Sequence, residues 1–194
     1  MTSESRTEKP SAATSDPTTH FGFRDVPVDE KRKLVGEVFS SVASRYDLMN
    51  DLMSLGIHRL WKRYFVATSG VRRGDRVLDL AGGTGDIAAL LHPRVGEDGE
   101  IVVGDINSDM LRVGRDRLTD RGLVRGLRFM QMDAEALPFP DASFDLVTHS
   151  EVFEHVPDDA RGFAELRRVL RLGGQMVFTV PLFDAPHTVE PARL

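Results

Sequence analysis

The sequence lacks cysteine, an excess of basic residues and any long apolar run, and each absence excludes a class of protein. Without cysteine the chain forms no disulfide, no thiolate zinc site and no cysteine nucleophile, which fits a reducing compartment, so we expect a cytoplasmic protein. No apolar run approaches the ~20 residues of a membrane span, and the first residues contain no apolar h-region, so we expect no secretory signal. The net charge is −5, from 25 Lys and Arg against 30 Asp and Glu, so we expect no nucleic-acid partner.

The length and composition predict one compact domain behind a disordered tail. Hydrophobic residues make up 41% of the 194 residues and charged residues 28%, as in ordinary globular proteins. Residues 1–18 contain eight Ser or Thr and few apolar residues, so this segment cannot bury enough surface to fold. We expect residues 19–70 to form an N-terminal helical region on the substrate side and residues 71–194 to form the core, packed together as one domain.

After the predicted helices of 29–68, the hydrophobic pattern alternates between strands and helices. We predict strands at 76–80, 101–103, 127–132, 144–148 and 175–180. Predicted helices follow the glycine cluster near residue 85, begin at Asn107 and Ser108, and run from 158 to 170. This alternation is typical of an α/β fold with a parallel sheet covered on both faces.

A glycine-rich turn, residues 79–86, joins the first strand of this pattern to a helix. It suits either a dinucleotide, through the G-x-G-x-x-A pattern of Gly83 to Ala88, or S-adenosylmethionine (SAM), or a structural turn with no ligand. Asp105 lies twenty residues beyond Gly85, where a carboxylate can accept hydrogen bonds from both ribose hydroxyls. The chain lacks the second βαβαβ half that a dinucleotide normally spans, which favours SAM over an NAD-dependent oxidoreductase.

Four segments resemble the UbiE-type ubiquinone/menaquinone biosynthesis C-methyltransferases. They are residues 46–61 (YDLMNDLMSLGIHRLW), 19–23 (THFGF), 77–86 (VLDLAGGTGD) and 134–140 (AEALPFP). The resemblance covers residues 19 to about 150 and implies a Rossmann-like class I SAM-dependent methyltransferase fold. It also implies ring methylation of a polyprenylated quinol, with transient membrane contact because such a substrate lies in a bilayer.

The turn and the resemblance together predict which residues bind SAM. Asp133 would accept from the adenine amino group, the Ala134 N–H would donate to the ring, and Ser150 follows the fourth strand at the same crevice. The predicted cofactor-binding residues are Asp79, Gly82, Gly83, Thr84, Gly85, Asp105, Ile106, Asp133, Ala134 and Ser150.

After residue 150 the sequence departs from the UbiE pattern. Residues 151–155 (EVFEH) lack its Arg-Asn pair and resemble the stretch with which UbiG-type O-methyltransferases hold a divalent cation. We expect no metal; if one is present, its ligands are Glu151, Glu154 and His155. The catalytic base stays unassigned, with four candidates: His155, Glu154, His58 and Tyr46. The alternatives are therefore an O-methyltransferase and a SAM-binding module without catalysis.

The sequence also predicts an exposed sheet edge at the fifth strand. Only 14 residues follow Val180, too few for the helix and two-strand hairpin that usually continue the class I fold. An exposed edge is a liability unless another chain or loop covers it. Truncation, a chimeric sequence and closure of the edge in a homo-oligomer each explain this feature.

Overall fold

The structure is a computed structural model that describes residues 18–21, 24–27, 57–150 and 158–179. The chain divides into two compact units, Met1–Val38 and Phe39–Leu194, which are described separately. The tail as far as residue 17 lies outside the described residues. So do most of the predicted helical segment 29–68 and the candidates Tyr46, Glu151, Glu154 and His155.

In the first unit, the described residues form a two-stranded antiparallel hairpin. β1 (Thr18–Phe21) pairs with β2 (Arg24–Pro27), with Phe21 opposite Arg24. The hairpin takes in Thr18, which we expected in the disordered tail, and the start of the region 19–70, which we expected to be helical. Two residues connect its strands, and Thr, Phe and Val in this segment favour β structure. The prediction of a helical region did not take this local pattern into account.

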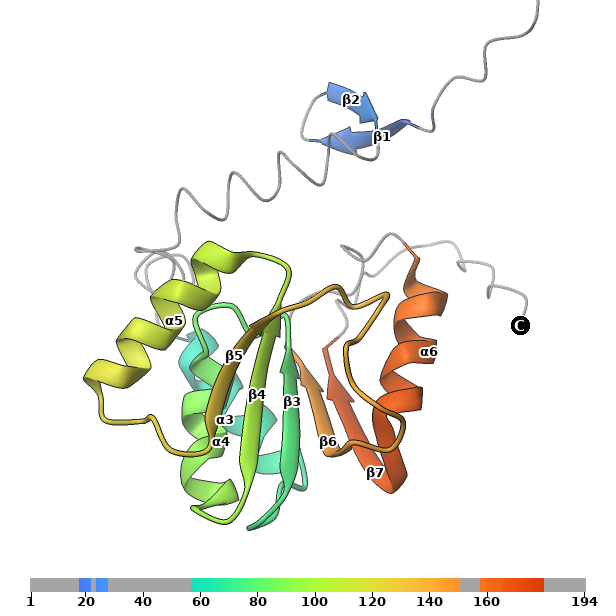
Figure 1. The fold of residues 1–194 in the computed structure, drawn as a ribbon. Helices are drawn as coiled ribbons and strands as arrows, with labels where there is room; N and C mark the ends of the chain where they lie inside the picture. The colour runs from blue at the N-terminus through green and yellow to red at the C-terminus, as the bar shows by residue number, and fades with distance from the viewer. Residues whose placement is uncertain (1–17, 22–23, 28–56, 151–157, 180–194) are drawn as a thin grey trace, which may run out of the picture. The chain divides into compact units, whose positions relative to one another are not determined.

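The second unit is built on a five-stranded parallel sheet of order β5-β4-β3-β6-β7 (Figure 1). Its strands are β3 (Arg76–Leu80), β4 (Glu100–Asp105), β5 (Leu127–Gln131), β6 (Phe144–His149) and β7 (Leu170–Phe178). The helices are α3 (Ile57–Thr68), α4 (Asp86–Val95), α5 (Ser108–Asp120) and α6 (Asp159–Val169). The predicted α/β fold with a parallel sheet is confirmed.

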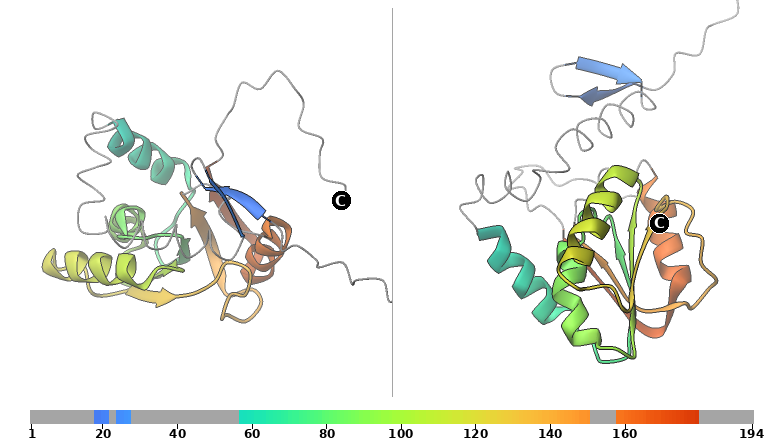
Figure 2. Two further views of the ribbon diagram at one scale, coloured as in Figure 1. Left: turned by 90° about the horizontal axis from the view of Figure 1, so that it is seen from above. Right: turned by 60° about the vertical axis from the view of Figure 1, so that its left-hand side comes forward.

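The helices cover both faces of the sheet, with α3, α4 and α5 on one side and α6 on the other (Figures 1 and 2). Successive strand residues therefore enter two separate cores: Val77 packs in the core that includes α3 and α4, and Leu78 packs in the core that includes α6. Both side chains are fully buried. This two-sided burial explains why the strands are nearly continuous apolar runs rather than alternating patterns.

β7 begins five residues earlier than the predicted start at Gln175. Leu170 pairs with Phe144, and regular pairing resumes with Gln175 opposite Leu146, so the intervening residues form an irregularity beside Asp145. Gly173 and Gly174 lie in this segment, and Gly173 adopts a positive φ of 81°. The helix α6 thus runs directly into β7 without a separate loop.

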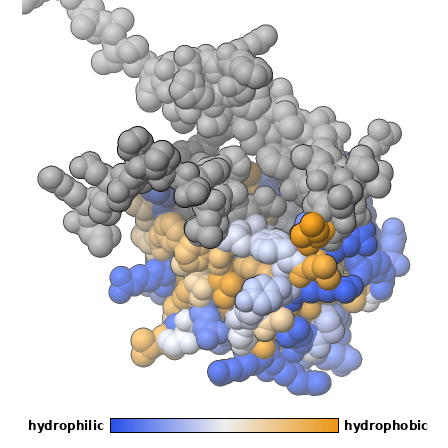
Figure 3. Space-filling model, turned by 180° about the vertical axis from the view of Figure 1, so that it is seen from behind, coloured by the Kyte–Doolittle hydropathy of each residue, from blue (hydrophilic) through white to orange (hydrophobic). Residues whose placement is uncertain are grey.

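β7 forms one edge of the sheet within the described residues, as predicted. It pairs only with β6. Leu172 and Phe178 on this strand are exposed apolar side chains. Figure 3 shows hydrophobic residues at the surface beside hydrophilic ones, on the face opposite to that of Figure 1.

Candidate functional site

The candidate site lies where the carboxyl ends of β3, β4 and β6 meet. β3 pairs with β4 on one side and with β6 on the other, although β6 comes two strands later in the chain than β4. The strand order reverses here, and in open α/β sheets such a switch point opens a crevice at the carboxyl ends of the strands. The loops that follow these strands carry the residues predicted to bind the cofactor.

The glycine turn after β3 folds tightly against the end of β4. The Gly82 N–H donates to the Gly104 carbonyl at 3.1 Å, and the Gly85 N–H donates to the Gly82 carbonyl at 2.7 Å. Gly83 and Gly85 have positive φ angles of 50° and 77°, a conformation that other residues adopt at a cost. The predicted turn is therefore present, with Gly85 at the start of α4.

Asp105, at the end of β4, is tied to this turn. Its Oδ2 accepts a hydrogen bond from the Gly83 N–H at 2.9 Å, and its Oδ1 accepts one from the Asn107 N–H at 2.8 Å. Burial raises the pKa of the Asp105 carboxyl, and these backbone donors partly offset that rise. Each oxygen keeps further lone-pair capacity, so the carboxyl can still accept hydrogen bonds from a ligand.

Asp79 lies beneath the turn and has no solvent-exposed surface. The Thr148 hydroxyl donates to its Oδ1 at 2.8 Å. Burial raises the pKa of Asp79 to about 7, although the Thr148 hydrogen bond acts in the opposite direction. A Cβ on Gly82 would come within 2.9 Å of Asp79 Oδ2, so the carboxyl and the turn require glycine at this position.

Three further predicted cofactor-binding residues, Ile106, Asp133 and Ala134, follow the ends of β4 and β5. Ile106 is 62% exposed, a large apolar side chain next to a half-buried carboxyl. The Gln131 side chain donates to the Ile106 carbonyl at 2.9 Å and links the ends of β4 and β5. Asp133 caps the following turn, because its Oδ1 accepts the Glu135 N–H at 3.0 Å. Ala134 lies within that turn.

Thr84 belongs to the glycine turn and is buried where the turn meets α5. The Arg117 guanidinium donates to its carbonyl at 2.7 Å. A Cβ on Gly114 would come within 2.8 Å of the Thr84 backbone, so α5 packs directly against the turn through a glycine. In this structure Thr84 anchors the turn, and its predicted contact with the cofactor stays a prediction.

The end of β6 completes the crevice. Ser150 follows His149 and its carbonyl accepts a hydrogen bond from the Thr179 hydroxyl at 3.0 Å. The His149 ring contacts the Leu80 carbonyl at 3.0 Å through Nδ1, and burial lowers the pKa of this histidine. The buried ring therefore connects β6 to β3 directly before the glycine turn.

Of the candidates for catalysis and metal binding, the structure describes only His58. Tyr46, Glu151, Glu154 and His155 are outside the described residues. His58 lies on α3 and lines a separate pocket with residues of α4 and α5. Within the described ranges, no three His, Asp or Glu side chains are grouped to hold a metal ion. In the same ranges, no helix combines the length and apolar character needed to cross a bilayer.

Two residues that support the site were missed from the sequence. Thr148 was treated only as the end of a strand, although it supplies the donor to Asp79. Gly114 was not singled out; a glycine inside an otherwise helical pattern is the signal that could have revealed it, since such a residue often marks close packing.

The chain matches the family model described as the ubiE/COQ5 methyltransferase family over residues 26–182. The match continues past residue 150, where the resemblance described above ends. A protein of Xanthomonas campestris pv. campestris named "Ubiquinone/menaquinone biosynthesis C-methyltransferase UbiE" is 68% identical over 158 residues, 81% of this chain and 62% of that protein. A protein of the same name from Xylella fastidiosa (strain M12) is 65% identical, again over 81% of this chain and 62% of that protein. The chain thus spans about 62% of the length of these curated relatives.

Solved structures share the fold. The YcgJ protein from Bacillus subtilis is 31% identical with a TM-score of 0.55, over 59% of this chain and 47% of that one. A SAM dependent methyltransferase from Aquifex aeolicus is 23% identical with a TM-score of 0.53, over 57% of this chain and 58% of that one, and shows the fold alone. The Rossmann-like class I fold predicted from the sequence is confirmed.

Proposed function

Because the chain belongs to the ubiE/COQ5 methyltransferase family, we propose that it binds SAM and takes part in methylating a ring carbon of a polyprenylated quinol. The observation that carries the proposal is the position of Asp105. Its carboxyl is joined to the Gly83 N–H at the switch point of the sheet, beside the exposed Ile106. A carboxylate, a glycine turn and an apolar surface side by side suit a nucleoside attached to an amino acid.

The described residues fit this cofactor. Asp105 would accept hydrogen bonds from the ribose hydroxyls, and Ile106 would cover one face of the adenine ring. Asp133 and Ala134 would contact the edge of that ring, and the turn from Gly82 to Gly85 would lie against the amino-acid end. Asp79 is fully buried, so it would act by holding the turn rather than by touching the ligand.

The chemistry needs orientation and exclusion of water more than it needs protein functional groups. When bound, SAM supplies an electrophilic methyl group on a sulfonium. The protein must hold the ring carbon in line with that group, keep water out and accept one proton. His155, Glu154, Tyr46 and His58 are the candidates for the proton acceptor, and the first three lie outside the described residues.

The proposal also covers where the protein acts and how it assembles. We propose action in the cytoplasm with transient contact to the membrane that holds the prenyl chain. We also propose that a second copy of the chain pairs with β7, which forms one edge of the sheet within the described residues, since edge strands invite pairing.

The experiment that tests the function combines binding with turnover. The purified chain is titrated with SAM by calorimetry, then incubated with labelled SAM and demethylmenaquinol under reducing conditions. We expect saturable binding and labelled methylmenaquinol. Labelled product carrying the methyl on oxygen would favour the O-methyltransferase alternative, and SAM binding without transfer to any quinol would favour the non-catalytic module. Binding of NADH but not SAM would overturn the proposal.

A further inference from the structure

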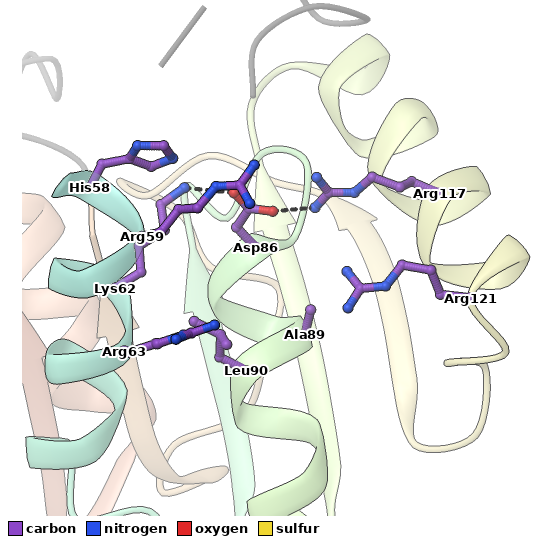
Figure 4. Close-up of a pocket in the computed structure, with 9 residues that line it drawn as sticks. All are labelled: His58, Arg59, Lys62, Arg63, Asp86, Ala89, Leu90, Arg117 and Arg121. Atoms are coloured by element: carbon purple, nitrogen blue, oxygen red, sulfur yellow. Dashed lines mark hydrogen bonds and ion pairs between the residues drawn. The ribbon is translucent and has the colours of Figure 1, made fainter. Parts of the chain in front are cut away.

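A cationic pocket of about 230 Å³ lies over the outer side of α4, between α3 and α5 (Figure 4). Ala89 and Leu90 of α4 contribute its apolar part. The basic side chains that line it come from two helices that are far apart in the sequence: Arg59, Lys62 and Arg63 from α3, and Arg117 and Arg121 from α5. None of the residues that line this pocket is among the predicted cofactor-binding residues, although the pocket borders the glycine turn through Asp86 and includes the candidate base His58.

Among the described residues, one carboxylate, that of Asp86, lines the pocket, and two of the cations bind it. Lys62 Nζ lies 2.7 Å from Asp86 Oδ2, and the Arg117 guanidinium contacts Asp86 Oδ1 at 2.5 Å. Of the described residues that line the pocket, five are Lys or Arg and one is Asp, which gives these residues a net charge of +4, whereas the whole chain carries −5. The positive charge is therefore concentrated at this place.

Arg63 and Arg121 contribute two of these positive charges, one from each side of the pocket. Within the described residues, neither forms an ion pair, whereas Arg112 and Arg115 on α5 each contact a carboxylate. Figure 4 shows Arg63 and Arg121 reaching toward α4 from opposite sides, over Leu90 and Ala89. Burial and the nearby charge of Arg121 lower the pKa of Arg117, as expected for cations held close together.

We propose that this pocket is a binding site for a phosphate-bearing anion, with Arg63 and Arg121 as ligands from its two sides. Guanidinium groups offer paired donors that match phosphate oxygens, and two arginines on facing helices can hold one anion between them. Anion binding would also offset the repulsion between these side chains. A free diphosphate and a phospholipid headgroup present the same chemistry to the pocket.

The test uses inorganic diphosphate as the probe, with three forms of the chain. The pocket variant carries Arg63→Gln and Arg121→Gln. The control carries Arg112→Gln and Arg115→Gln, which also removes two positive charges, but outside the pocket. We expect calorimetric binding to the wild type, a dissociation constant about tenfold or more higher for the pocket variant, and one within about twofold for the control. Thermal midpoints and SAM titrations of all three forms check that the fold and the glycine turn are intact.

A second arm distinguishes the source of the phosphate. Flotation with phosphatidylcholine vesicles, with and without phosphatidylglycerol, compares the same three forms. Loss of binding to the anionic vesicles in the pocket variant alone assigns a lipid headgroup, and loss of diphosphate binding alone assigns a free anion. The proposal is overturned if the wild type binds neither probe, or if the pocket variant and the control bind equally well.

Discussion

The backbone N–H of Gly83 donates to Oδ2 of Asp105 at 2.9 Å, across 22 positions of the sequence. This bond joins the turn after β3 to the end of β4. It sets the carboxyl of Asp105 against the glycine turn, and the Asn107 N–H holds its other oxygen. The bond thus joins the two loops into one surface.

Replacing Asp105 tests that surface. Asp105→Asn keeps the size of the side chain but removes its charge and one acceptor. We expect SAM affinity to fall by about 1.5–3 kcal/mol, since hydrogen bonds to a charged group are worth that much. Calorimetry measures the SAM affinity. The control is Asp116→Asn, which replaces an exposed carboxylate on α5. An affinity within about twofold of the wild type would show that Asp105 does not contact the ribose.

Gly114 tests the packing of α5 on the turn. An added methyl group at this position would lie within 2.8 Å of the Thr84 backbone. We expect Gly114→Ala to lower the free energy of unfolding by about 1–3 kcal/mol, as overpacking does, and to weaken SAM binding because the turn must move. Denaturant unfolding measures the first effect. The exposed Arg112→Ala on the same helix should change neither quantity, and a Gly114→Ala variant as stable as the wild type would contradict the packing.

Asp79 predicts a pH dependence of stability. Its folded-state pKa of about 7 lies above the ordinary value of 3.8, so the folded chain binds this proton more tightly than the unfolded chain does. The contribution of protonated Asp79 to the free energy of unfolding is complete below pH 4 and is lost as the pH rises through about 7. The shift corresponds to at most about 4 kcal/mol.

The Asp79→Asn variant isolates this effect because it cannot ionise. Unfolding free energies of wild type and variant are compared at pH 5 and pH 8. We expect the difference between them to move in favour of the variant at the higher pH. A difference that is the same at both values would show that Asp79 does not titrate in this range.

Chelation separates the two kinds of methyl transfer. The proposed ring methylation needs an electrophilic methyl group and a proton acceptor but no Lewis acid, so EDTA should leave the rate within about twofold. Product formation from labelled SAM measures the rate. A loss of about tenfold or more that Mg²⁺ restores, and that His155→Ala reproduces, would instead support metal-assisted O-methylation through Glu151, Glu154 and His155.

The order of strands and helices could be read from the sequence because it depends on local patterns. Apolar runs such as 76–80 predict buried strands, and Asn107 caps α5 as its position suggests, by accepting from the Asp109 and Met110 N–H groups. The start of β7 could not be read in this way. Its first residue, Leu170, follows directly on α6, and the pairing with β6 that places it is a long-range contact.

The motifs also predicted the glycine turn and the carboxylate of Asp105 at the end of the next strand, since residue type and spacing are sufficient for that; contact of these residues with SAM stays a prediction. The contacts between distant residues depend on the folded chain. Thr148 meets Asp79 only because β6 lies beside β3, and Gly114 meets Thr84 only because α5 packs against the turn. The cationic pocket has the same origin: α3 and α5 bring five basic side chains around Asp86 only when both helices flank α4.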